Sequence, residues 1–171
     1  MKMALTACLG ACLTFALASP SFADGIVPPN YSFSIYGPGN LVKNGGQESW
    51  ACAWNFKMVS GPATGTNPPN ASSGSVTGGS APAPSACSDI TISPTTWEII
   101  SVDGDGGEGR FIGLRIKEGL STFCWTNGWV PFTIENHGDA PTVFTLTGAD
   151  IGPDCKFSAS LNTAADLNVV E

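Results

Sequence analysis

The chain has 171 residues, a formal net charge of −7 with only seven lysines and arginines, and 42% hydrophobic residues. This length and apolar content suffice for one domain with a hydrophobic core. An acidic chain with scattered basic residues lacks the basic face that nucleic acids require, and it disfavours binding to an anionic membrane surface. We therefore expect neither partner.

Residues 1–23 have the features of a secretory signal peptide. Lys2 precedes the apolar run Met3–Leu17, and small residues lead up to Ala23. The run is shorter than the stretch of about 20 apolar residues that crosses a bilayer. We predict export to the outside of the cell or to its surface (through the periplasm in a bacterium). The mature chain is then a single secreted β-domain over residues 24–171, without a transmembrane segment.

The first part of this domain predicts short strands separated by turns. Tyr31–Tyr36 alternates apolar and polar residues, Gly37–Gly39 is expected to turn the chain, and Asn44–Gly46 is a strong hairpin signal. In Ser49–Val59 every second residue is apolar or a cysteine, which places these residues on one face of a strand, against the core. They are Trp50, Cys52, Trp54, Phe56 and Met58.

Residues 60–86 consist almost entirely of Gly, Pro, Ser, Thr, Ala and Asn, and Val76 is their only large apolar residue. Such a segment cannot bury enough surface to become ordered as part of a core. We predict a surface loop that Cys52 and Cys87 tether, with a functional loop as the alternative.

Strand patterns return after Cys87, and no segment carries an apolar stripe at helical spacing over three turns. The prediction is an all-β fold, either a disulfide-tied β-sandwich or a partly closed antiparallel barrel of roughly eight to ten short strands. The later strands are expected at Ile90–Ile92, Thr96–Asp103, Arg110–Lys117, Thr122–Trp125, Trp129–Glu135, Thr142–Thr147 and Cys155–Leu161.

Four cysteines follow residue 23: Cys52, Cys87, Cys124 and Cys155. None belongs to a Cys-x-x-Cys pair, so zinc binding and thiol-redox chemistry have little support. In an oxidising compartment an even number indicates two disulfides, for which three connectivities exist. We prefer Cys52–Cys87 and Cys124–Cys155, because each pair brackets one contiguous part of the chain. On the chain-entropy model, closing a loop of about 35 residues stabilises a fold by roughly 3–4 kcal/mol.

The densest carboxylates are Asp103, Asp105 and Glu108, within Asp-Gly-Asp-Gly-Gly-Glu. Ca²⁺ ligands often alternate along a loop in this way. The segment is not an EF-hand, because the twelfth position from Asp103 is Leu114. A polar hairpin turn whose glycines supply positive φ is the preferred interpretation, and a calcium site is the alternative.

Three tryptophans, Trp97, Trp125 and Trp129, are candidates for an aromatic platform that faces a sugar or another apolar ligand. Trp125 and Trp129 flank an expected hairpin turn, although core packing is the usual place of a tryptophan. The single histidine, His137, lies in a turn, and no Gly-x-Ser-x-Gly elbow marks a nucleophile. We therefore predict no catalytic residues and no enzyme.

The order of cysteines and strands carries a resemblance to a known family. The residues concerned are Phe33–Leu41, Cys52–Phe56, Cys87–Ile90 followed by Trp97, then Cys124 and Cys155–Leu161. In this order they resemble the secreted bacterial family called protein activator of alkane oxidation (Pra-type). The resemblance implies an extracellular protein that helps cells to use water-insoluble hydrocarbons by aiding emulsification or surface contact. It assigns no functional residue.

Three hypotheses about function follow. The first is a secreted, non-enzymatic protein that contacts hydrocarbon or components of the cell surface. The second is a self-assembling extracellular fibre or adhesin subunit, in which Tyr31–Tyr36 completes the sheet of a neighbouring copy by strand addition. The third is a calcium- or sugar-binding module that uses the three carboxylates and the three tryptophans named above.

Overall fold

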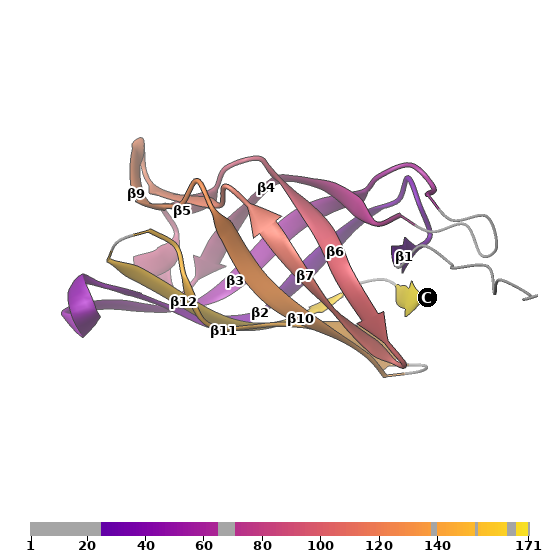
Figure 1. The fold of residues 1–171 in the computed structure, drawn as a ribbon. Helices are drawn as coiled ribbons and strands as arrows, with labels where there is room; N and C mark the ends of the chain where they lie inside the picture. The colour runs from indigo at the N-terminus through magenta and orange to yellow at the C-terminus, as the bar shows by residue number, and fades with distance from the viewer. Residues whose placement is uncertain (1–24, 65–70, 138–139, 153, 164–166, 171) are drawn as a thin grey trace, which may run out of the picture.

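The computed structural model describes residues 25–64, 71–137, 140–152, 154–163 and 167–170 (Figure 1). The predicted signal peptide lies outside these residues. The thirteen strands are β1 (Gly25–Val27), β2 (Ser32–Lys43), β3 (Glu48–Ser60), β4 (Ser73–Ala83), β5 (Ile90–Ile92), β6 (Thr95–Asp103), β7 (Gly106–Ile112), β8 (Arg115–Glu118), β9 (Ser121–Trp125), β10 (Trp129–His137), β11 (Ala140–Asp150), β12 (Cys155–Thr163) and β13 (Asn168–Val170). Two short 3₁₀ turns, η1 (Asn44–Gly46) and η2 (Ser85–Cys87), complete the described elements.

Eight strands close into an antiparallel barrel. Around the ring the order is β2, β3, β4, β6, β7, β10, β11 and β12, after which β12 pairs with β2. Each strand therefore lies beside the barrel strand that follows it along the chain, which is an up-and-down arrangement. The all-β prediction is confirmed, and of its two architectures the structure shows the barrel, closed all the way round.

The loop expected over residues 60–86 was wrong for residues 73–83, which form β4. This strand pairs with β3 on one side and with β5 and β6 on the other. Its small residues serve the closure of the barrel. A side chain on Gly74 would collide with the ring of Trp97 on β6, so the bare backbone makes room for a buried indole. β4 is ordered by its neighbours rather than by its own side chains.

The inward residues of the barrel strands pack as one aromatic core. The rings of Phe56 and Phe111 are stacked, with centroids 5.6 Å apart, and Trp54 meets Phe157 edge-on at 4.7 Å. A ring of eight strands leaves an interior just wide enough for side chains to fill. This barrel follows that rule, because its interior is occupied by large rings.

Two further glycines explain how such large side chains fit. Gly37–Gly39 does not turn the chain as expected: β2 continues through it, and a side chain on Gly39 would collide with Trp54. On β7, a side chain on Gly109 would collide with the ring of Phe132. Pairing a small inward residue with a large one is a common way to fill a narrow barrel.

Both ends of the barrel are covered. At one end β1 pairs with β13 and buries Ile26, Leu167 and Val169. At the other end β5, β8 and β9 extend the sheet from β4, and their inward residues, among them Ile92 and Ile116, join the barrel core. Figure 1 shows β1 and β9 at opposite ends of the molecule.

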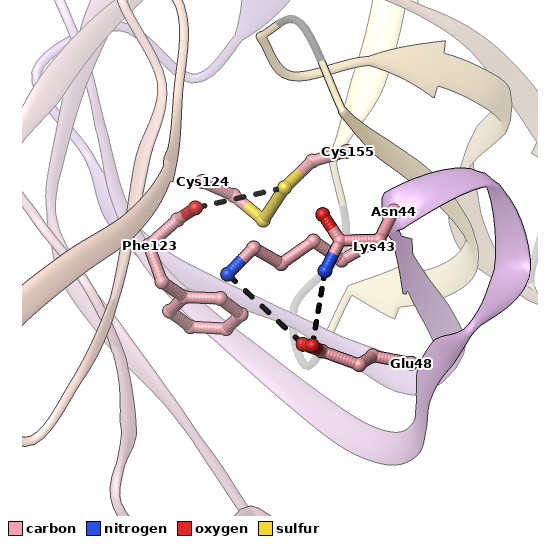
Figure 2. The surroundings of a disulfide bond; sticks show 6 residues. All are labelled: Lys43, Asn44, Glu48, Phe123, Cys124 and Cys155. Carbon is pink, nitrogen blue, oxygen red and sulfur yellow. Dashed lines mark hydrogen bonds and ion pairs between the residues drawn. A yellow bond between two sulfur atoms is a disulfide. The ribbon is translucent and has the colours of Figure 1, made fainter.

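Both disulfides form with the preferred connectivity. Cys52–Cys87 joins β3 to η2, just before β5, and Cys124–Cys155 joins β9 to β12. Around the second bond the ammonium group of Lys43 lies 5.6 Å from the ring centroid of Phe123 (Figure 2). The three-stranded extension is therefore fastened to the barrel by one bond near its start and another near its end.

We expect the double substitution Cys124→Ala/Cys155→Ala to lower the free energy of unfolding by about 2–4 kcal/mol, because it releases the constraint on the unfolded chain. Urea denaturation followed by fluorescence measures this change. Ser121→Ala, on the same strand but outside the disulfide, is the control and should leave the midpoint unchanged. An unchanged midpoint in the double variant would contradict the structural role of the bond.

We expect Gly109→Ala to lower the free energy of unfolding by about 1–3 kcal/mol, because the added methyl group must displace the Phe132 ring in a filled core. The control is Gly128→Ala in the exposed turn before β10, where the nearest atom belongs to the Thr126 side chain. Thermal denaturation of both variants tests this, and equal melting temperatures would show that the core accommodates the methyl group.

Candidate functional site

Candidate binding surfaces lie on the outer face of the barrel, since large rings occupy its interior and short strands cover its ends. Along each strand the outward residues alternate with the core residues. On a solvated barrel we expect the outward residues to be polar. Two places on the outer face depart from this expectation.

The first is an apolar groove of about 580 Å³ on the outer face of β2 and β3, beside the end of β4. We define the apolar groove by its outward residues, which are Tyr36, Pro38, Ala51, Ala53, Asn55 and Pro82, and of these Asn55 carries a polar amide. Pro38 and Ala53 lie opposite each other in the register of β2 and β3, so the middle of the groove carries no long side chain. None of the described residues that line it is charged.

The second is an exposed tryptophan on the outer face of β10, 64% of whose surface is accessible. The guanidinium carbon of Arg110 lies 3.8 Å from the centroid of the Trp129 ring. Arg110 in turn forms an ion pair with Glu98 on the neighbouring strand β6. We call Trp129, Arg110 and Glu98 the Trp129 platform. The stacked cation holds the ring in place, an interaction worth about 0.5–1 kcal/mol at an exposed site.

Beside the Trp129 platform lies a hollow of about 220 Å³ with mixed polar and apolar walls. Glu108, Thr133 and Thr145 form one cross-strand row of outward residues over β7, β10 and β11. Ile100 and Pro131 supply the apolar part of the wall. The hollow therefore offers carboxylate and hydroxyl groups on the same outer face as the Trp129 ring, about 13 Å further along β10.

The three tryptophans that were predicted to form a platform lie in different surroundings and differ in exposure. Trp97 is 0% exposed and contacts Phe33 at 6.5 Å between ring centroids, so its expected role facing a ligand is wrong. Trp125 is 46% exposed on β9, and Trp129 is 64% exposed on β10. In the part of the chain that the structure describes, no ring contact joins the two. Of the three, only Trp129 belongs to a platform with polar neighbours.

The acidic segment is a hairpin turn. Asp103 ends β6, Asp105 lies in the turn, and Glu108 lies further along, on the outer face of β7. Gly104 has a φ of 58°, which is the positive φ that the hairpin interpretation requires. Among the described residues, no group of three or more His, Cys, Asp or Glu side chains is placed to hold a metal ion. The calcium alternative therefore has no geometric support.

His137 ends β10, and its Nε2 lies 3.7 Å from a carboxylate oxygen of Glu135. Both side chains are largely exposed. A solvated pair of this kind contributes little energy and does not hold the imidazole in one orientation. A general base needs such an orientation toward the group whose proton it takes.

Comparison of the chain with protein-family models, with curated proteins and with solved structures finds no match. The resemblance to alkane-oxidation activators therefore rests on the quoted segments alone. Across the described residues, no helix has the length and apolar character needed to span a membrane.

Sequence reasoning missed the apolar groove for two reasons. Ala51 and Ala53 occupy the outward positions of β3, whose pattern in the sequence comes from its large inward residues. Small outward residues do not by themselves indicate a surface groove. Pro82 belongs to the segment that was expected to be a loop. The detectable signal was the lack of charge at consecutive outward positions of two neighbouring strands.

We expect millimolar Ca²⁺ to leave the melting temperature unchanged, because the carboxylates of the acidic turn do not converge. A site occupied at this concentration would stabilise the native state by mass action. Differential scanning calorimetry with Ca²⁺ and with a chelator makes the comparison, and Mg²⁺ at equal ionic strength is the control. A rise in the melting temperature with Ca²⁺ but not with Mg²⁺ would support a calcium site.

Proposed function

We propose that the protein is a secreted, non-enzymatic barrel that assists contact with water-insoluble hydrocarbon or its emulsification. The observation that carries this proposal is the apolar groove on the outer face of β2 and β3. The resemblance to alkane-oxidation activators points to the same class of function. The two disulfides fit a protein that works in an oxidising compartment outside the cytoplasm.

The filled interior decides how such a protein would work. A barrel that carries an apolar ligand inside needs an empty lumen, whereas here Phe56, Phe111 and Phe157 occupy the centre. Hydrocarbon would therefore be held on the outside. Removing apolar surface from water releases about 25 cal/mol per Å². An alkyl chain in the groove gains this without leaving a charged group desolvated.

Charge distribution supports action at an interface. The chain carries a net charge of −7, while the described residues that line the apolar groove carry none. Net charge keeps a protein soluble. An uncharged groove on an acidic molecule would orient the molecule at an oil–water boundary, with the groove toward the oil. Such an arrangement favours coating of droplets.

The alternative of a fibre subunit receives less support from the geometry. β2, which contains most of the expected donor segment Tyr31–Tyr36, pairs with β3 along its whole length and also with β12. Donating it to a neighbouring copy would open the barrel and expose the aromatic core. Strand addition favours an exposed sheet edge, which this strand does not have.

We expect Ala53→Glu to reduce the partition of the protein onto hexadecane droplets by about tenfold or more, because a carboxylate in the apolar groove must lose its hydration on contact with oil. The matched control is Thr91→Glu, which adds the same charge at an exposed outward position of β5. Pendant-drop tensiometry and droplet depletion provide the measurements, and circular dichroism checks the fold.

Two outcomes would contradict this proposal. If the unmodified protein neither lowers the interfacial tension nor binds droplets, the hydrocarbon function is lost. If it does both and Ala53→Glu behaves like Thr91→Glu, hydrocarbon is held elsewhere than in the apolar groove.

A further inference from the structure

The Trp129 platform lies on strands that take no part in the apolar groove, and it has a different chemical character. A tryptophan that is 64% exposed keeps a large apolar surface in water. A single exposed apolar side chain is common on protein surfaces, so the case for a binding site rests on the neighbours of this ring. Its polar neighbours indicate which ligand it suits.

The ring is held before any ligand arrives. Arg110 stacks on it at 3.8 Å, and the ion pair with Glu98 fixes the guanidinium group in turn. All three residues project from paired strands of the barrel rather than from a loop. A fixed ring loses little conformational entropy on binding, so more of the contact energy appears as affinity.

A row of polar groups continues from the platform along the same face. Glu108, Thr133 and Thr145 lie side by side on three adjacent strands. Thr133 is four residues beyond Trp129 on β10, which corresponds to about 13 Å along a strand. A ligand that contacts both the ring and this row is therefore longer than a single sugar ring.

We propose that the outer face of β6, β7 and β10 around Trp129 binds a neutral oligosaccharide. A pyranose ring has an apolar C–H face that packs on an aromatic ring and a rim of hydroxyl groups that donate and accept hydrogen bonds. The carboxylate of Glu108 accepts such bonds, and the hydroxyl of Thr133 both donates and accepts them. The ring and the polar row match these two parts of the ligand.

Charge on this face selects among possible ligands. Glu98 and Glu108 are both negative, and the one nearby cation on the platform, Arg110, is already paired with Glu98. An acidic polysaccharide would meet repulsion here. Hydrocarbon would strip water from the carboxylates and the guanidinium group at a cost that stacking on one ring does not repay. A neutral saccharide avoids both penalties.

The test is calorimetric titration of the purified, oxidised protein with neutral glucose and N-acetylglucosamine oligomers of increasing length, with a polyuronate oligomer for comparison. We expect at least one neutral series to bind, more tightly as its length grows beyond one unit. Trp129→Ala should weaken binding by about tenfold or more. Trp125→Ala, which removes another exposed tryptophan, is the matched control and should bind as the unmodified protein does.

Three results would overturn the proposal: no heat with any neutral oligomer at millimolar concentration, equal affinity in the Trp129→Ala variant, or tighter binding of the polyuronate. The hydrocarbon function is tested separately on the same variants. Ala53→Glu should bind saccharide normally, and Trp129→Ala should still partition onto hexadecane. If Trp129→Ala instead loses droplet binding and no oligomer binds, the platform belongs to the hydrocarbon surface and the saccharide site is refuted.

Discussion

Pairing of β3 with β4 is the constraint on which the structure depends, because it closes the ring. β4 brings few large side chains of its own, so this closure rests on backbone hydrogen bonds and on side chains of neighbouring strands, Trp97 at Gly74 and Ile92 at Gly79, that occupy its small positions. Without β4 the sheet would have free edges at β3 and β6, beside the buried rings of Trp54 and Trp97. The filled interior and the distinct outer faces both follow from closure.

Much of this fold could be predicted from the sequence where side chains alternate. β3 and β12 stand out because every second residue faces a core. Of the three cysteine connectivities that the sequence left open, the preferred one is confirmed. β4 could not be found in this way, because a strand of glycine and serine has no apolar period. The expected turn at Gly37–Gly39 was wrong for a related reason: Gly39 leaves space for Trp54, and Gly37 leaves space for the backbone of β12, instead of bending the chain.

The candidate sites were only partly predictable. The hairpin expected between Trp125 and Trp129 does not form, because β9 pairs with β8 whereas β10 pairs with β7 and β11. Both tryptophans are nevertheless exposed. The burial of Trp97 was harder to predict, because it depends on Gly74, which belongs to the unexpected strand β4. Stacking of Arg110 on Trp129 and the cross-strand row at Glu108 arise from strand register, which a single sequence does not specify. The sites depend on which strands become neighbours, whereas the core depends mainly on the pattern within each strand.

The order of strands around the ring has a consequence for how the molecule would act. In the ring of eight strands, β2 and β3 lie across the barrel from β7 and β10. The apolar groove and the Trp129 platform therefore lie on opposite sides of the barrel. One flat particle therefore cannot engage both faces of a single copy. A molecule with both sites occupied connects two separate ligands, and the width of the packed barrel sets the distance between them. If both proposed sites are occupied, one copy would link an oil surface to a saccharide, and the strength of that link would depend on how many copies lie between the two.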